Sequence, residues 1–247
     1  MAPRPLLPLV LLLGACHREG APPPPSPPPP TPRDLSTAPV PPDLAPPVSL
    51  AIPPDATKCP DDMAPIPIGG CIDKWEASAA PGGALGSPDG RKTTVVAQSA
   101  PGRPPLARVT RAQAERACRN AKKRLCTEAE WVSACRGPAK WQYPYGPAFE
   151  PRRCIDWDAS DNGKKGAAPT GSAPRCVTPW GVFDLANNVG EWVAASEEDR
   201  SGFAEIRGGT YNMTVIDSAC DSDDYRVRPT VQTPDVGFRC CRDAPKR

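Results

Sequence analysis

Apolar residues follow three different patterns along the chain. A short apolar run from Leu6 to Leu13 comes first, and a proline-rich stretch with few apolar side chains follows it. From residue 58 onward, brief apolar stretches are interrupted by glycine and proline. Within this last part, four small residues recur at helical spacing, which predicts a helix over residues 110–121 with Thr110 as its N-cap. The four are Ala114, Ala117, Cys118 and Ala121.

A second helix is predicted to start at Thr127. The sequence Thr127-Glu128-Ala129-Glu130 has the form of a capping box, in which the threonine oxygen accepts an amide hydrogen and Glu130 reaches back. Gly137 marks its end. The remainder reads as short strands and irregular loops with frequent turn signals, so little regular secondary structure is expected.

The amino-terminal apolar run is too short to span a membrane, because a spanning helix needs about 20 residues. It has the form of a secretory signal. The sequence Leu13-Gly14-Ala15-Cys16 resembles the lipobox of bacterial lipoproteins, which implies that residues 1–15 are removed and that Cys16 is acylated. The alternative is an ordinary signal peptide with a chance cysteine at its end.

Residues 16–57 are expected to form a tether. Sixteen of the 37 prolines lie between Pro22 and Pro54, and proline favours an extended polyproline II conformation. Such a spacer could reach on the order of 120 Å. It would hold a domain formed by residues 58–247 outside the cytoplasm. His17 follows the lipidated cysteine in place of the aspartate associated with inner-membrane retention, so the outer membrane is the default location.

Histidine and net charge exclude several classes of function. The only histidine, His17, precedes the tether, so histidine-based triads and histidine-ligated metals are excluded from the domain. The formal net charge is +2, with 30 basic and 28 acidic residues and no long basic run. Nucleic acid is therefore not an expected partner.

Ten of the 11 cysteines lie in the domain, an even number. In an oxidising compartment this number favours up to five disulfides. A thiolate metal cluster is the alternative, but the paired C-x-x-C arrangement of a zinc ribbon is missing. The spacing of the cysteines leaves their connectivity open.

Five sequence blocks resemble the formylglycine-generating enzyme family, also called sulfatase-modifying factors, in the family's order. The resemblance implies an α+β domain with a loop-rich variant of the C-type lectin fold and low regular secondary structure. The blocks are KRLCTEAEW (residues 123–131), YPYG (143–146), GVFDLANNVGEW (181–192), RGGTY (207–211) and GFRC (237–240).

The family's oxidases bind copper(I) through two cysteines that follow the RGG-aromatic block. Here Met213 and Ser218 stand at those positions, and the nearest thiol is Cys220. A thioether can ligate copper(I) but cannot form a disulfide with a substrate. No catalytic residue is therefore assigned, and copper is not expected. The vicinal pair Cys240-Cys241 offers a redox alternative, against which structural disulfides are favoured.

The resemblance also suggests a disulfide pattern. Cys118 and Cys135 keep the spacing of two structural cysteines of the family, and Cys240 matches the usual partner of the first. A consistent completion of the pattern adds four pairs: Cys135–Cys220, Cys154–Cys176, Cys59–Cys71 and Cys126–Cys241.

A structural calcium site is implied by the GVFDLANNVGEW block. Asp184 and Glu191 would supply carboxylate oxygens, and Asn187 and Val189 would supply backbone carbonyls, a mixture that calcium accepts. In the alternative reading this block is a turn in which Asp184 caps amides and Glu191 meets an arginine.

Three functions are compatible with these features. The favoured one is a lipid-anchored, non-catalytic binding or structural module of the cell envelope, with an envelope protein or peptide as its ligand. The others are a formylglycine-generating-type oxidase and a maturation factor that acts on an exported protein by different chemistry. The family's iron-dependent sulfoxide-forming relatives need histidine ligands, which the domain lacks.

Overall fold

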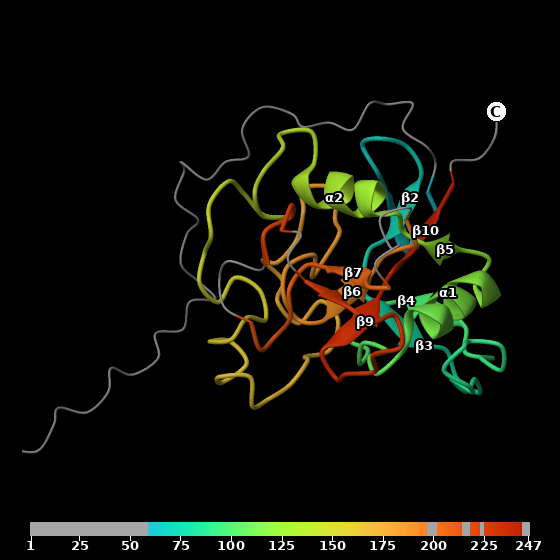
Figure 1. Ribbon diagram of the computed structural model, residues 1–247. Coiled ribbons are helices and arrows are strands. Elements are labelled where there is room, and N and C mark those ends of the chain that lie inside the picture. Colours follow the sequence, from blue (N-terminus) through green and yellow to red (C-terminus); the bar gives the residue numbers. More distant parts are fainter. Residues whose placement is uncertain (1–58, 197–201, 214–217, 223–224, 244–247) are drawn as a thin grey trace, which may run out of the picture. The chain divides into compact units, whose positions relative to one another are not determined.

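Two short helices and ten strands of two to four residues make up the regular secondary structure of the described residues (Figure 1). The structure, a computed structural model, describes residues 59–196, 202–213, 218–222 and 225–243. In chain order the elements are β1 (Met63–Pro65), β2 (Cys71–Asp73), β3 (Ala77–Ala79), β4 (Ala97–Ser99), α1 (Arg111–Asn120), β5 (Arg124–Leu125), α2 (Glu128–Arg136), β6 (Gly190–Trp192), β7 (Ala204–Arg207), β8 (Arg226–Val227), β9 (Val236–Phe238) and β10 (Cys240–Arg242). The predicted α+β class with little regular structure is confirmed.

Both predicted helices are present and begin where their caps predict. Thr110 Oγ1 accepts a hydrogen bond from Gln113 N, and Gln113 Oε1 accepts one from Thr110 N, so α1 also starts with a capping box. At α2, the predicted reciprocal bonds between Thr127 and Glu130 are formed. Gly137, with φ 59°, ends α2 in a conformation that suits glycine.

The four-stranded sheet β1-β2-β10-β5 is antiparallel and separates two clusters of buried side chains. Neighbouring residues of a strand point to opposite faces, so Cys240 of β10 joins the cluster of α1, while Cys241 joins the cluster of α2. Figure 1 shows β10, at the red end of the chain, between the two helices. The last strand therefore connects both halves of the core.

The second four-stranded sheet has the order β8-β7-β6-β9, with β6 and β9 parallel. One face carries Trp192, Ile206 and Phe238 into the cluster of α1. The opposite face is charged, because Glu191 and Arg207 are register partners on β6 and β7. This charged face is the side on which Trp131 of α2 lies.

Five disulfides join all ten cysteines of the described residues. They are Cys59–Cys71, Cys118–Cys240, Cys126–Cys241, Cys135–Cys220 and Cys154–Cys176. Cys118–Cys240 is the pair that the family resemblance suggested, and the other four bonds are the pairs that were added to complete the pattern. Three of them close loops of 85 residues or more, so they connect distant parts of the chain.

The predicted leader and tether, residues 1–57 with Cys16, lie outside the described residues. None of the helices in the described part of the chain has the length and apolar character needed to cross a membrane.

Candidate functional site

The segment predicted to bind calcium forms a tight turn that leads into β6. Asp184, Asn187 and Asn188 all adopt left-handed backbone conformations, with φ of 56°, 60° and 60°. Asp and Asn are the non-glycine residues that tolerate this region best. Asn187 N donates to Gly208 O and Asn187 Nδ2 donates to Thr210 O, so the turn is tied to the RGGTY block. Local sequence and tertiary bonds thus agree on one conformation.

Glu191 and Arg239 form a fully buried ion pair beneath this turn. Arg239 Nε lies 2.7 Å from Glu191 Oε2, and Arg239 Nη2 lies 2.6 Å from Glu191 Oε1. Arg239 Nε also lies 2.9 Å from Glu191 Oε1, and Trp131 Nε1 donates a fourth hydrogen bond, 2.7 Å long, to Glu191 Oε2. Bidentate geometry and full hydrogen bonding are what a buried pair requires to offset its desolvation.

Glu76 is a third buried acid at this centre, and sequence reasoning missed it. Its Oε1 accepts from Val189 N and its Oε2 accepts from Asn188 Nδ2. Burial raises the pKa of Glu76 well above its ordinary value, and the charges of Asp184 and Glu191 raise it further. Glu76 follows β2 by three residues, and no spacing in the sequence connects it to residues 184–191.

Asp184 completes the centre. Its Oδ2 accepts from Gly171 N at 2.7 Å, and Arg239 Nη2 donates to the carbonyl oxygen of Phe183. Burial raises the pKa of Asp184 to about 6. The contacts expected for a turn without calcium are therefore present, since Asp184 accepts a hydrogen bond from an amide and Glu191 pairs with an arginine.

The charges of this centre allow a test of whether calcium fits. Three buried carboxyl groups, those of Glu76, Asp184 and Glu191, face one guanidinium, that of Arg239. If all three ionise, two negative charges remain, and one divalent cation would neutralise them. Glu191 already accepts four hydrogen bonds, so it would have to share its oxygens with Arg239 and Trp131. Calcium fits the donors in charge and in oxygen chemistry.

No three Asp, Glu, Cys or His side chains are grouped to hold a metal ion together anywhere in the described part of the chain. A calcium ion at this turn would therefore depend on backbone oxygens as well as on carboxylates, as the proposed contributions of Asn187 and Val189 require.

One of the two positions of the family's oxidase cysteines, Met213, lies next to the same turn, because Met213 N and Asn187 Nδ2 both donate to Thr210 O. Met213 follows the RGGTY block, and its carbonyl oxygen accepts from Trp157 N. Ser218 is buried, and Cys220 is bonded to Cys135 of α2. Residues 214–217 between them lie outside the described residues. In the described part of the segment, no thiol is free.

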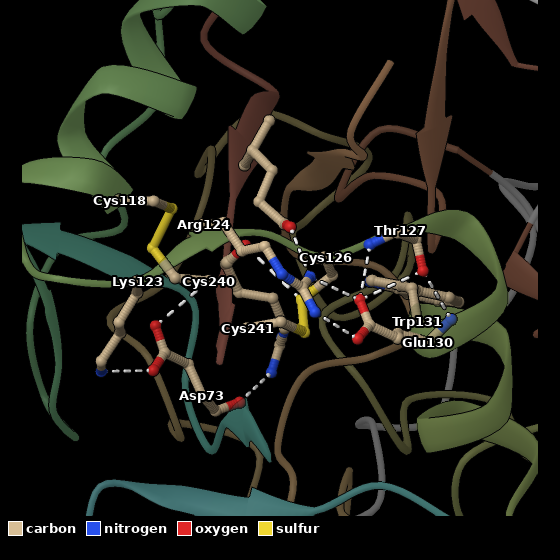
Figure 2. The surroundings of a disulfide bond; sticks show 12 residues. Asp73, Cys118, Lys123, Arg124, Cys126, Thr127, Glu130, Trp131, Cys240 and Cys241 are labelled. Carbon is tan, nitrogen blue, oxygen red and sulfur yellow. Dashed lines mark hydrogen bonds and ion pairs between the residues drawn. A yellow bond between two sulfur atoms is a disulfide. The ribbon is translucent and has the colours of Figure 1, made fainter. Parts of the chain in front are cut away.

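Two disulfides on adjacent residues of β10 lie among ionised side chains (Figure 2). Asp73 of β2 accepts from the Cys240 amide at 3.1 Å and from Lys123 Nζ at 2.6 Å. Burial raises the pKa of Asp73 to about 6 although Lys123 opposes the shift. On the other side, Arg124 forms two 2.7 Å hydrogen bonds to Glu130. The KRLCTEAEW block thus supplies ion pairs around the crosslinks, and all four cysteines are buried.

The fold and the site define a disulfide-linked α+β domain with a buried carboxylate–arginine centre. The family profile described as sulfatase-modifying factor enzyme 1-like domain matches residues 75–244. The chain belongs to this family, as the five sequence blocks predicted.

Named relatives include active and inactive proteins. The chain is 36% identical over 142 residues to the inactive C-alpha-formylglycine-generating enzyme 2 of Bos taurus, covering 49% of this chain and 44% of that one. It is 34% identical over 157 residues to the formylglycine-generating enzyme of Thermomonospora curvata, covering 49% and 50%. The chain thus spans about half the length of these curated relatives.

Among solved structures, the fold is similar to that of PvdO from Pseudomonas aeruginosa. The TM-score is 0.51 at 18% sequence identity, and the match covers 70% of this chain and 80% of the other. A likeness at this identity concerns the fold alone.

Proposed function

We propose that this chain is a lipid-anchored, extracytoplasmic member of the family that acts as a non-catalytic binding or structural module of the cell envelope. The single observation that carries the proposal is the state of the thiols. Met213 and Ser218 stand where the family's oxidases have cysteines, and Cys220 is bonded to Cys135. An envelope protein or peptide is the proposed ligand.

The chemistry of the oxidase supports this proposal. Copper(I) is a soft ion that needs thiolate ligands, and thiol oxidation needs a sulfur that can be deprotonated. Met213 supplies a thioether, Ser218 supplies a hydroxyl group, and the sulfur of Cys220 is already in a disulfide. The Bos taurus relative, which carries the word inactive in its name, is compatible with the same loss.

The test is an aldehyde assay. The purified protein is incubated with copper(I), oxygen and a C-x-P-x-R peptide, and the Thermomonospora curvata enzyme serves as the positive control. We expect no aldehyde above the reaction without protein. Aldehyde formation would overturn the proposal and favour an oxidase or maturation factor acting on an exported protein.

Membrane attachment is proposed from the Leu13-Gly14-Ala15-Cys16 sequence and the proline-rich residues that follow it. The chain should incorporate labelled palmitate in a bacterial host, and a Cys16→Ser variant should not. Fractionation is expected to recover the lipidated chain with the outer membrane. Equal label in both variants would refute acylation at Cys16.

We further propose that a structural calcium ion is held at the turn by Asp184, Asn187, Val189 and Glu191. The excess of buried carboxylates around Arg239 supports it. Bound calcium would stabilise the turn, so a chelator should lower the melting temperature and added calcium should restore it. An Asp184→Asn variant should respond less to the chelator. An unchanged melting temperature in excess chelator would refute the proposed calcium site.

A further inference from the structure

The surface around α1 carries a concentration of positive charge. Three segments meet there: residues 87–93, residues 108–122 and residues 228–233. Together they contain eight basic and two acidic residues, a net charge of +6, whereas the whole chain has a net charge of only +2. Six of the basic residues are arginines: Arg91, Arg108, Arg111, Arg116, Arg119 and Arg228. The two lysines are Lys92 and Lys122. These eight residues are called the basic face.

Hydrogen bonds and a close backbone approach place the three segments side by side. Thr110 Oγ1 donates to Pro88 O, and Arg111 N donates to Pro229 O. The backbone of Gly90 lies so close to α1 that a β-carbon there would be 2.4 Å from Ala112 O. Gln232 Nε2 donates to Arg108 O. The positive charges therefore belong to one continuous part of the surface, and Figure 1 shows α1 with the teal loops of the first segment beside it.

The side chains of the basic face are open to solvent or partly open. Arg91 and Arg119 have side-chain exposures of 86% and 53%, and Lys92, Arg108, Lys122 and Arg228 are also exposed. The two acids are each paired with an arginine of the face, Asp89 with Arg91 and Glu115 with Arg119. The pairing of these two acids leaves five basic residues of the face without an acidic counterpart among the described residues of the three segments: Lys92, Arg108, Arg116, Lys122 and Arg228.

Arg111 lies at the end of α1 that is unfavourable for a cation, whereas Arg119 lies in the favourable last turn. Arg111 is the first residue of α1, where the positive end of the helix dipole disfavours a cation, and the first turn has no acid. A pocket of about 640 Å³ opens beside it. Asp89 and Glu115 line this pocket with Arg111, so the pocket does not concentrate positive charge. The charge is instead spread over a wide surface.

We infer that the basic face binds the anionic phosphate headgroups of a membrane surface. Guanidinium groups pair with phosphate oxygens in a bidentate manner, and arginines predominate here. The basic charges are spread over an open surface and do not converge on a concave site. Such an arrangement matches a membrane surface with many identical anions better than it matches one small ligand. The inference rests on the proposed membrane attachment for its setting, because a tether keeps the domain near such a surface.

The test uses the full-length chain with Cys16→Ser, so that no lipid is attached, and sedimentation with vesicles. One set of vesicles is phosphatidylcholine alone, and the other contains one quarter phosphatidylglycerol. We expect binding to rise with phosphatidylglycerol and to fall as salt increases, because exposed charges are screened. The leader is present in every variant, so its apolar contribution is the same throughout.

The face variant is Lys92→Glu with Arg228→Glu, and the matched control is Lys164→Glu with Lys165→Glu, which changes the same charge at exposed positions outside the face. Each basic residue near an anionic surface strengthens binding roughly fivefold, so the face variant should bind phosphatidylglycerol vesicles at least about 20-fold more weakly than the control. Equal binding by the two variants, or no dependence of the parent on phosphatidylglycerol, would overturn the inference. Unchanged melting temperatures verify folding, and neither result depends on acylation or on aldehyde formation.

Discussion

Arg239 joins three buried segments of the domain by hydrogen bonds. Its guanidinium binds both carboxylate oxygens of Glu191 and also donates to the carbonyl oxygens of Asp73 and Phe183. One side chain thus satisfies groups from β2, β6 and the predicted calcium turn. Removing it would take the counter-ion from the buried Glu191 carboxylate, which would keep the hydrogen bond from Trp131, and would take a donor from two carbonyl groups.

Replacing Arg239 with methionine should therefore lower the free energy of unfolding by about 3–5 kcal/mol. Urea unfolding followed by tryptophan fluorescence measures the change. The double variant Arg239→Met with Glu191→Gln should be more stable than the single variant, because the uncompensated charge is gone. A loss below about 1 kcal/mol, or a double variant as unstable as the sum of the two single losses, would contradict this role.

The buried carboxyl group of Asp73 is expected to make the stability of the domain depend on pH. Its pKa is raised from 3.8 to about 6 because it is buried, so the folded chain holds its proton more tightly than the unfolded chain does. The resulting stabilisation is complete below pH 3.8 and is lost as the pH rises through 6. Relative to an Asp73→Asn variant, the wild type should lose about 3 kcal/mol of stability between pH 3.5 and 7.

Urea midpoints of both proteins across that pH range test the prediction. The comparison with Asp73→Asn cancels the other buried acids, which both proteins share. If the wild type gained stability relative to the variant as the pH rose, the Asp73 carboxylate would be stabilised by Lys123 more than burial destabilises it.

The residues of the buried carboxylate–arginine centre were only partly predictable from the sequence. Asp184 and Glu191 stand in one short block, so their proximity follows from the family spacing. Glu76 lies more than 100 residues earlier, and only the folded chain brings it to Val189 N. The contact between Arg239 and Glu191 is likewise a result of the parallel pairing of β6 with β9, for which the sequence carries no local signal.

At the scale of elements, the cap of α2 combines a capping box with an ion pair on the same carboxylate. Thr127 Oγ1 accepts from Glu130 N, Glu130 Oε2 accepts from Thr127 N, and Arg124 binds both oxygens of Glu130. The arginine and the threonine amide lower the pKa of Glu130, although burial opposes them. The helix is thereby joined to β5 by the same carboxylate that caps it.

A Thr127→Ala variant should lose about 1 kcal/mol of stability because an amide of the first turn loses its acceptor. Thr127→Ser keeps the hydroxyl group and should lose much less. Chemical denaturation of the two variants distinguishes the cap from the methyl group of threonine. Equal losses would assign the effect to packing of that methyl group.

Helices and strands differ in how far the sequence predicted them. Each helix has a cap and about ten residues in which a period of 3.6 can repeat, and both begin as expected. Each strand has only two to four residues, which is one or two periods of alternation. Their partners are set by distant contacts and by disulfides, so the sheet order could not be read from local pattern.

At the scale of the whole molecule, the adjacent disulfides of β10 constrain the same long loop. Cys118–Cys240 and Cys126–Cys241 have sequence separations of 122 and 115 residues. Once either bond has formed, the other closes only the short segment between Cys118 and Cys126. Each bond is therefore a partial substitute for the other in restricting the unfolded chain.

Removing one of these bonds by a pair of Cys→Ala changes should cost about 2.5 kcal/mol, and removing both should cost about 7 kcal/mol, more than the sum of the single losses. Removal of Cys59–Cys71, which closes a separate loop of 12 residues, provides the additive control. Strict additivity of the two β10 bonds in urea unfolding would show that the shared loop does not determine their effect.

The central place of β10 also has a consequence for biosynthesis. A polypeptide that emerges amino-terminus first exposes Cys118 and Cys126 long before their partners, Cys240 and Cys241, are synthesised. These two early thiols are eight residues apart and could join each other if oxidation came too soon. Maturation of this domain should therefore depend on a disulfide isomerase or on delayed oxidation, and a nascent chain arrested before residue 240 should accumulate the non-native Cys118–Cys126 bond.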